Sequence, residues 1–518
     1  MTVYLVGAGP GDPGLLTVRA AELLASADVV VHDRLSAPGL LALAPEGADI
    51  RSVGKDPHGL SVPQEDINDL LVELGSAGLE VVRLKGGDPY VFARGAEEAL
   101  ALEAAGIDYE VVPGISSAIA APAYAGIPVT MRYSSTSVTI VTGHEDPKKA
   151  KVDVGWEALA QVGGTIVILM GVANIGEISR RLLAGGLPGS TPVAAVRWGT
   201  RPDQSVIRST LAEIPSEPLR SPSTIVVGEV ARQSLDWFTR RPLFGTKVAV
   251  TRSAAQVSQL ATKLRRVGAE VIEVPTIEIV DSADGGVALR AAVSNVRDYE
   301  WVILTSPNGA RRFCAELRDG RDLAGVKLAA IGPGTAAVLA EYSLVADLQP
   351  ERFVAESLLD AFPLPDWEPG SSSATGPGHE PGSVLDSEAK SAVGSGPRVL
   401  IPRAAVGRDV LPNGLRDRGW VVDVVEAYQT VPRAPTEAES AALATAEVVT
   451  FTSASSVRNL LASIGSDKVP STVVTIGPIT TEEARAAGLT VDVEAEVHTI
   501  AGLVDALVDS LVARRSAQ

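Results

Sequence analysis

The chain has a single cysteine, fewer positively charged than negatively charged residues, and no long apolar run. Cys314 is the only cysteine among 518 residues, which excludes an intramolecular disulfide and any metal cluster held by several cysteines. No apolar stretch approaches the roughly 20 residues of a membrane span. Met1 is followed directly by a strand-like segment rather than by a signal peptide. We therefore expect a cytoplasmic protein with no metal centre and no membrane contact.

The charge balance bears on the class of ligand. The chain has 45 Lys and Arg against 63 Asp and Glu, a net charge of −18. Proteins that bind nucleic acid without sequence preference depend on Lys and Arg to neutralise phosphates, so this charge argues against a nucleic-acid partner. An anionic small molecule would need local arginines. The length and the 46% hydrophobic content predict roughly three or four compact units.

A boundary near residue 243 divides the chain into two halves. Residues 230–242 have the pattern of a closing helix, and a new strand begins at Lys247. We therefore expect one domain at 1–242 and another at 243–518, each folding alone. Residues 363–397 are rich in Pro, Gly and Ser and have almost no large apolar side chains, which predicts a flexible surface insertion.

The second half contains an internal repeat with an offset of roughly 150 residues. Three pairs of segments correspond: 247–279 with 398–430, 301–313 with 448–460, and 328–339 with 473–484. The paired positions include Arg252 with Arg403, Ser306 with Ser453, and Gly332 with Gly477. Strand and helix signals alternate in each repeat, so we expect two similar α/β units with parallel sheets and a ligand site in the cleft between them.

Two glycine-rich turns follow apolar strands in the first half. They are VGAGPGDPG at 6–14 and RLKGGDPYVFARG at 83–95. The first fits the dinucleotide fingerprint G-x-G-x-x-G, with Asp33 about 20 residues further on, and alone it would predict a dehydrogenase. However, Pro10 and Pro13 remove two N–H donors from the segment that would bind a pyrophosphate. The loop is therefore better suited to a ligand without phosphates.

A series of motifs extends these turns over almost all of residues 1–240. They are HDRL (32–35), VGK (53–55), VPQED (62–66), VVPGISSA (111–118), YAGIPVT (124–130), VTGH (141–144), ILMG (168–171), GTRPDQ (199–204) and IVVGEV (225–230). In this order the half-chain resembles the uroporphyrinogen-III C-methyltransferases. The resemblance implies a two-lobed tetrapyrrole methylase fold, S-adenosylmethionine as methyl donor, and a homodimer formed through this domain.

The second half resembles the uroporphyrinogen-III synthases. The resemblance rests on the turns T-S-x-x-[GS] and I-G-P in both repeats and on EAYQT at 426–430. It implies a two-lobed α/β synthase fold with parallel sheets. Together the halves imply a bifunctional enzyme that cyclises hydroxymethylbilane to uroporphyrinogen III and methylates it twice to precorrin-2, on the branch to sirohaem and cobalamin.

Methylation of a pyrrole carbon requires a later proton loss, so an acid–base pair is expected. The resemblance implies Asp33 as proton acceptor and Lys55 as proton donor, although a turn aspartate and a solvated lysine are ordinary at strand ends. It implies donor-binding roles for Pro10, Gly86, Gly87, Asp88, Val91, Ser116, Ser117, Met170, Gly199 and Val227. Arg94 and Arg132 are candidates for binding substrate carboxylates. Met131 replaces the family's usual histidine, which puts any histidine role there in doubt.

In the synthase half the resemblance implies Tyr428 as general acid. Ser306 and Ser453 begin equivalent turns after apolar strands, where hydroxyl and N–H groups can bind acetate or propionate. Helix N-capping alone would also explain both serines.

Three alternatives remain open at this stage. The first half could methylate another corrinoid precursor, the second could be a non-catalytic two-lobed ligand-binding module, and the chain could be a dehydrogenase. Turnover of hydroxymethylbilane by 243–518 would eliminate the binding module. Failure to bind a nicotinamide nucleotide while binding S-adenosylhomocysteine would eliminate the dehydrogenase.

Overall fold

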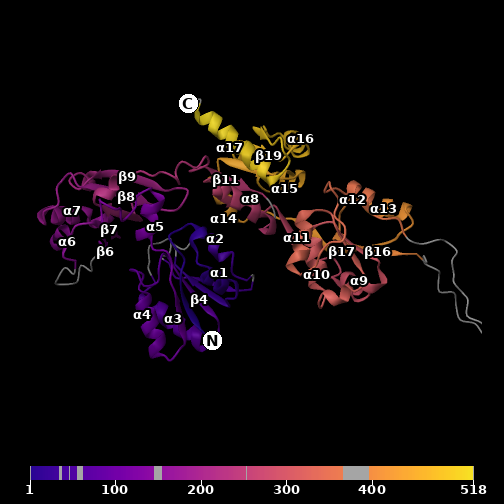
Figure 1. The fold of residues 1–518 in the computed structure, drawn as a ribbon, viewed down its shortest axis with the longest axis horizontal. Coiled ribbons are helices and arrows are strands. Elements are labelled where there is room, and N and C mark those ends of the chain that lie inside the picture. Colours follow the sequence, from indigo (N-terminus) through magenta and orange to yellow (C-terminus); the bar gives the residue numbers. More distant parts are fainter. Residues whose placement is uncertain are drawn as a thin grey trace, which may run out of the picture.

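The chain builds four five-stranded sheets, two in each half (Figure 1). The computed structural model describes residues 2–33, 38–45, 47–54, 62–144, 154–251, 254–365 and 396–516. We call the four sheets, with their helices, lobes 1 to 4 in chain order of their first strands. In the described ranges, no helix is both long and apolar enough to cross a membrane.

Lobe 1 has a fully parallel sheet in the order β3-β2-β4-β1-β5. Its strands are β1 (Val3–Gly7), β2 (Val29–His32), β3 (Asp49–Ser52), β4 (Val81–Lys85) and β5 (Tyr109–Val112). Its helices are α1 (Val18–Ala25), α2 (Pro38–Leu41), α3 (Gln64–Ser76) and α4 (Gly95–Ala104), with a 3-10 turn at Pro13–Leu15. Helices cover both faces of the sheet, with one core cluster on each face, so the strands are mostly apolar; the exceptions on β4 are the buried Arg83 and Lys85.

Lobe 2 has a mixed sheet in the order β6-β7-β10-β8-β9, in which only β6 and β7 are parallel. The strands are β6 (Val138–Thr142), β7 (Thr165–Leu169), β8 (Pro192–Arg197), β9 (Ser205–Thr210) and β10 (Ser223–Val227). The helices are α5 (Ser117–Tyr124), α6 (Trp156–Val162) and α7 (Ile175–Ala184), with 3-10 turns at Val172–Asn174, Ile214–Ser216 and Glu229–Arg232. Helix α5 begins next to the lobe 1 sheet and packs on the lobe 2 sheet through Ala121, so it joins the two lobes.

The segment after β10 is not the predicted helix. Only Glu229–Arg232 is helical, as a 3-10 turn, and the chain then packs on α5 through its side chains. Trp237 and Phe238 contact Tyr124 with ring centroids 4.8 and 4.7 Å apart, and Trp237 Nε1 donates a hydrogen bond to the Ala123 carbonyl at 3.0 Å. The helix prediction is wrong because these aromatic contacts hold the segment in an irregular path.

Lobe 3 has a fully parallel sheet in the order β12-β11-β18-β19-β20. The strands are β11 (Lys247–Val250), β12 (Glu270–Glu273), β18 (Val448–Phe451), β19 (Thr472–Thr475) and β20 (Val493–Glu494). The helices are α8 (Ala254–Arg266), α14 (Glu437–Leu443), α15 (Ala454–Ile464), α16 (Pro478–Ala486) and α17 (Ile500–Ser516), with a 3-10 turn at Ser466–Lys468.

Lobe 4 has the order β13-β17-β16-β14-β15, parallel except for the edge strand β13. The strands are β13 (Ile277–Val280), β14 (Trp301–Leu304), β15 (Lys327–Ala330), β16 (Arg398–Ala404) and β17 (Val421–Pro432). The helices are α9 (Val287–Ser294), α10 (Pro307–Ala315), α11 (Pro333–Glu341), α12 (Ala355–Ala361) and α13 (Val410–Asp417), with 3-10 turns at Val296–Asp298 and Gly320–Leu323. Most of the predicted insertion, residues 366–395, lies outside the described residues, as does Arg252.

The expectation that each repeat forms its own unit is wrong, because each lobe combines parts of both repeats. The strands β11 and β12 open the first repeat, yet they pair with β18 and β19 of the second. Conversely, β14 and β15 close the first repeat and share a sheet with β16 and β17. In Figure 1, α8 and the yellow α17 accordingly lie side by side in lobe 3.

Each lobe contains strands of both repeats because the chain crosses twice between lobes 3 and 4. After β12 the chain enters lobe 4 as β13, and β17 runs back beside β13, with Ile277 opposite Pro432 in an antiparallel pair. The Arg433 guanidinium donates to the Pro275 carbonyl at 3.2 Å. The two crossing segments therefore hydrogen-bond to each other. These bonds hold in place the arrangement in which each lobe contains strands of both repeats.

The connector between the halves ends in the core of lobe 3. Leu243 is fully buried there with residues of α8 and α17, whereas Leu235, on the side of the first half, is 62% exposed. Removing buried methyl groups from such a site costs about 2–5 kcal/mol.

We expect Leu243→Ala to lower one thermal transition of the chain by roughly 5 °C or more, since each kcal/mol shifts the midpoint of a domain this size by about 2–4 °C. Differential scanning calorimetry measures the shift. The matched variant Leu235→Ala should leave every transition nearly in place. Equal shifts in the two variants would contradict the burial argument.

Candidate active sites

Three loops of lobe 1 meet at the carboxyl ends of β4, β1 and β5. Gly9 and Gly87 exchange both backbone hydrogen bonds, at 3.2 and 2.8 Å. A Cβ on Gly114 would lie 2.2 Å from the Gly87 carbonyl oxygen, and one on Gly7 would lie 2.5 Å from the Gly114 Cα. The backbones are thus in contact without side chains between them. The carboxyl edge of a parallel sheet is the usual place for a ligand in α/β folds.

Two predicted donor-binding residues shape these loops. Asp88 accepts hydrogen bonds from the backbone N–H groups of Gly114 and Tyr90, at 3.0 and 2.8 Å. Ser116 caps α5 by accepting from the Ala118 N–H at 3.2 Å. Contact of Asp88 and Ser116 with a donor stays a prediction, as it does for the neighbouring loop residues Pro10, Gly86, Val91 and Ser117.

Lobe 2 contributes loops with unusual backbone conformations. Met170 follows β7 with φ 55°, and its side chain is half exposed. Trp198 and Thr200 also have positive φ, at 50° and 75°. In lobe 1, Phe92 and Arg94 have φ 55° and 61°. Positive φ in residues other than glycine costs free energy and is concentrated at functional sites.

Two predicted residues of lobe 2 have packing roles. Gly199 lies against α5, where a Cβ would be 2.3 Å from the Ala121 Cβ. Val227 is 1% exposed, and its side chain lies in the lobe 2 core. Packing therefore accounts for both residues, and a contact of either residue with the donor stays a prediction.

Asp12, which the sequence reasoning did not assign, ties the first glycine-rich loop to lobe 2. Its backbone N–H donates to Thr200 Oγ1 at 3.1 Å, and its carboxylate accepts from the Tyr124 hydroxyl at 2.8 Å and the Gly14 N–H at 2.8 Å. Burial and the contact with Asp12 raise the pKa of Tyr124 well above its usual range, so the phenol remains a donor. The only sequence feature that could have pointed to Asp12 is its position between two prolines.

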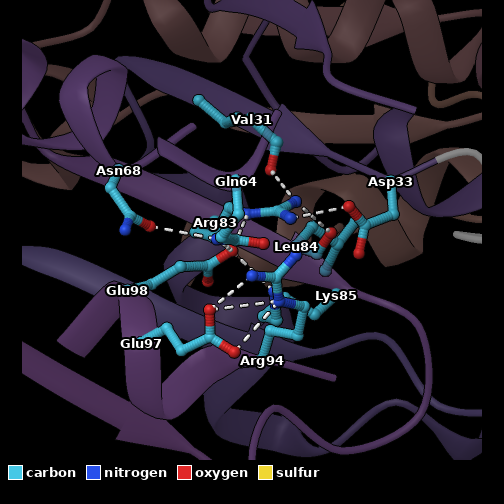
Figure 2. A network of polar contacts seen from close by, with 10 residues as sticks. All are labelled: Val31, Asp33, Gln64, Asn68, Arg83, Leu84, Lys85, Arg94, Glu97 and Glu98. Carbon is cyan, nitrogen blue, oxygen red and sulfur yellow. Dashed lines mark hydrogen bonds and ion pairs between the residues drawn. The ribbon is translucent and has the colours of Figure 1, made fainter. Parts of the chain in front are cut away.

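Asp33 lies at the end of β2 against a buried polar cluster (Figure 2). Its Oδ1 is 2.6 Å from Arg83 Nη2, and its side chain is 32% exposed. The cluster continues through Glu98 and Lys85 of the same lobe. Lys55, the predicted proton donor, lies outside the described residues.

The two predicted substrate arginines are on the surface of the methylase half. Arg94 pairs with Glu97 at 2.5 Å, as Figure 2 shows, and its side chain is 57% exposed. The Arg132 guanidinium lies 5.4 Å from the ring centroid of Tyr133. Both guanidinium groups are accessible, and their contact with substrate stays a prediction.

Lobe 4 contains a pocket of about 230 Å³ at the carboxyl ends of β14, β16 and β17. Tyr428 and Ser306 both line it, with the phenol oxygen 3.1 Å from Ser306 Oγ. Ser306 also caps α10 by accepting from the Gly309 N–H at 3.0 Å. Ser453 lies in lobe 3, where it caps α15. The structure thus brings Tyr428 and Ser306 together, and it places this pocket within one lobe rather than between two.

Two arginines of the pocket were not predicted. Arg403 and Arg408 line it, and Arg403 Nη2 is 2.7 Å from Asp409 Oδ1. Arg408 pairs with Glu356 at 2.8 Å. The alignment of the repeats had marked Arg403 as a corresponding position, but it gave no reason to expect a ligand there.

Comparison with known proteins agrees with this division of the chain. The family of Tetrapyrrole (Corrin/Porphyrin) Methylases matches residues 2–215, and that of Uroporphyrinogen-III synthase HemD matches residues 258–505. The porphyrin biosynthesis protein HemD of Ruminiclostridium josui is 38% identical over 98% of this chain and 97% of its own length. The chain belongs to this family of porphyrin biosynthesis proteins.

Other relatives match the first half alone. The S-adenosyl-L-methionine-dependent uroporphyrinogen III methyltransferase of Methanosarcina barkeri is 52% identical over 44% of this chain and 91% of its own length. The solved structure of uroporphyrin-III C-methyl transferase from Thermus thermophilus, complexed with S-adenyl homocysteine, is 39% identical over 45% of this chain and 99% of that chain, with a TM-score of 0.40. The predicted fold class and the predicted fusion of a methylase with a synthase are confirmed.

The contact at Gly114 provides a test of the first site. We expect Gly114→Ala to weaken binding of S-adenosylhomocysteine more than tenfold, because the new Cβ would lie 2.2 Å from a backbone oxygen and separate the loops. Isothermal titration calorimetry measures the affinity.

The matched control is Gly176→Ala, on α7, where an added Cβ meets nothing within 4 Å. That variant should bind as the unchanged protein does and gain slightly in stability from its helix propensity. Normal affinity in Gly114→Ala would show that the meeting of the loops is not part of the binding site.

Proposed function

We propose that the chain makes uroporphyrinogen III from hydroxymethylbilane in its second half and methylates it twice in its first half, giving precorrin-2. The observation that carries the proposal is that one chain combines two separate candidate sites, each at the carboxyl edge of a parallel sheet. Its similarity to a porphyrin biosynthesis protein over nearly the whole length supports the pairing of the two reactions.

The first site suits S-adenosylmethionine, which supplies an electrophilic methyl group when bound. The close contact of Gly7, Gly87 and Gly114 leaves a backbone surface at the sheet edge, and the half-exposed Met170 would add an apolar contact from lobe 2. The prolines of the first loop are consistent with a ligand that has no pyrophosphate. The main task of the protein is to hold donor and pyrrole carbon in reactive geometry.

Asp33 is suited to accept the proton that the methylated macrocycle loses. Arg83 occupies its Oδ1, and none of the described residues donates a hydrogen bond to Oδ2. Oδ2 is therefore available to the substrate. Lys55 would return a proton to the macrocycle, and Arg94 and Arg132 would bind carboxylates at the periphery.

The pocket of lobe 4 suits ring closure of the bilane. The reaction needs a protonated hydroxyl leaving group and a folded substrate rather than many catalytic side chains. Tyr428 is 7% exposed and can donate its phenol proton to that hydroxyl, while Ser306 orients the phenol. Arg403 and Arg408 supply positive charge for acetate or propionate groups. Ser453 remains a candidate for a similar contact from lobe 3.

Three further features are proposed with the reactions. The product enters sirohaem and cobalamin synthesis, the chain needs no metal, and the methylase half forms a homodimer, which is the commonest symmetric assembly. Light scattering of the full chain and of fragment 1–242 tests the dimer.

The decisive experiment incubates the full chain with hydroxymethylbilane and S-adenosylmethionine and analyses the tetrapyrroles by mass. A dimethylated product supports both activities. If the only product is uroporphyrinogen III without added methyl groups, the proposed methylase activity is contradicted. Closure only to the type I isomer at the spontaneous rate would remove the synthase, and binding of hydroxymethylbilane without turnover would support the ligand-binding alternative.

We expect Asp33→Asn and Lys55→Met to keep S-adenosylhomocysteine affinity and to lose most methyl transfer, about 10²-fold or more, as for groups that act on protons. Uroporphyrinogen III supplied directly keeps the synthase out of the assay. Unchanged turnover in both variants would reassign the two residues to turn structure.

We expect Tyr428→Phe to slow formation of the type III isomer about 10- to 100-fold and to raise the share of type I. The matched control is Tyr299→Phe in the same lobe. Tyr299 is also buried, and burial together with a hydrogen bond to Asp423 raises its pKa to about 12, but it does not line the pocket. The control should lose about 1 kcal/mol of stability and keep its rate. Equal rates in the two variants would argue against Tyr428 as the acid.

A further inference from the structure

Strand β4 carries two cationic side chains on a buried face. Arg83 and Lys85 are two residues apart, so they lie on the same side of the sheet as Val81, which packs against α3 and α4. Their exposed fractions are 2% and 1%. Two buried cations in a strand are costly unless each has an anionic partner.

Glu98, in the first turn of α4, is the buried partner. It is fully buried, and its Oε1 lies 3.1 Å from Arg83 Nε, 2.7 Å from Lys85 Nζ and 3.2 Å from Gln64 Nε2. All three donors share one oxygen, and no described residue donates to Oε2. A single carboxylate therefore faces two cations, although burial and the neighbouring Arg83 lower the pKa of Lys85.

Asp33 is the second carboxylate of the cluster. Arg83 Nη2 lies 2.6 Å from its Oδ1, while Nη1 faces the carbonyls of Val31 and Leu84 at 3.5 and 3.4 Å. The guanidinium is thus held on all three nitrogens, as Figure 2 shows. The backbone N–H of Asp33 also donates to the Leu84 carbonyl at 3.2 Å. Both the main chain and the side chain of Asp33 are therefore fixed to β4.

We propose that Arg83, locked in place by Glu98, is the positioning residue for Asp33: it fixes the carboxylate through Oδ1, so that Oδ2 is oriented to accept the proton from the macrocycle. The inference rests on the proposed role of Asp33. The methylated carbon already bears a carboxylate side chain and becomes quaternary, so the proton passes to Oδ2 from a bridging CH2 of the cationic macrocycle. The electron pair of the broken C–H bond neutralises the ring cation, and the resulting carboxylic acid releases its proton to solvent. Arg83 forms and breaks no bond.

The positioning role of Arg83 should be visible in the kinetics. Arg83 acts only through the carboxylate that it holds, so its loss should lower kcat and leave binding of the methyl donor in place.

The test measures kcat and KM for methyl transfer to uroporphyrinogen III in Arg83→Gln, Arg83→Lys, Asp33→Asn and the double variant Arg83→Gln/Asp33→Asn of the full chain. We expect Arg83→Gln to lower kcat about 10- to 100-fold with KM and S-adenosylhomocysteine affinity nearly unchanged. Arg83→Lys should recover part of kcat, because a cation that can contact Oδ1 remains. If Arg83→Gln does not fold, Arg83→Lys tests the proposal through a lower kcat at unchanged S-adenosylhomocysteine affinity.

The double variant should be no slower than Asp33→Asn alone, because Arg83 acts through Asp33. The control is Arg181→Gln, which breaks an arginine–carboxylate pair with Glu157 in lobe 2 and should leave kcat unchanged. An unchanged kcat in Arg83→Gln, or effects that multiply in the double variant, would overturn the proposal. Full activity of Asp33→Asn would instead refute the role of Asp33, and absence of methylation by the unchanged chain would refute the proposed function.

Discussion

Strand β4 is the constraint on which the candidate site of the first half depends. In the order β3-β2-β4-β1-β5 it lies between the strand that ends at Asp33 and the strand that leads into the first glycine-rich loop. Its last residues hold the Asp33 carboxylate through Arg83, and its following turn pairs with Gly9 through Gly87. Because parallel strands end at the same edge, one strand fixes the relative position of the candidate proton acceptor and the candidate donor loop. A shift of β4 by one residue would disturb both.

A second dependence connects the loops to the rest of the chain. The Asp12 carboxylate accepts from Tyr124, and the ring of Tyr124 contacts Trp237 and Phe238 of the connector. Phe238 in turn contacts Phe244, 5.4 Å away between centroids, next to the buried Leu243. The connector is therefore packed at both ends rather than loosely tethered. The sequence predicts that 1–242 and 243–518 fold independently. A cut after residue 242 separates Phe238 from Phe244, so neither fragment keeps this contact.

Much of the fold could be predicted from the sequence because the signals were local. Apolar strands that run into glycine-rich turns predicted the two loops that contain Gly9 and Gly87, and the strand and helix alternation predicted parallel sheets. The features that were predicted wrongly or missed depend on contacts between residues that are distant in sequence. Residues 230–242 have a helical pattern, yet Trp237 and Phe238 gain more from packing on Tyr124. Asp12 and Arg83 were not predicted as site residues because their partners are distant in sequence. Asp12 contacts Thr200, and Arg83 contacts Asp33.

The mixing of the two repeats in each lobe explains why the candidate pocket of lobe 4 could not be predicted from either repeat alone. A repeated pattern states which segments are alike, but it does not state whether β11 pairs with strands of its own repeat or of the other. In the structure, Ser306 comes from the first repeat, whereas Tyr428 and Arg403 come from the second, and the 3.1 Å contact between Ser306 and Tyr428 exists only because lobe 4 contains both. A single repeat would lack half of this pocket. The crossings at β13 and β17, which hold this mixing of the repeats in place, are therefore as necessary to the site as the side chains that line it.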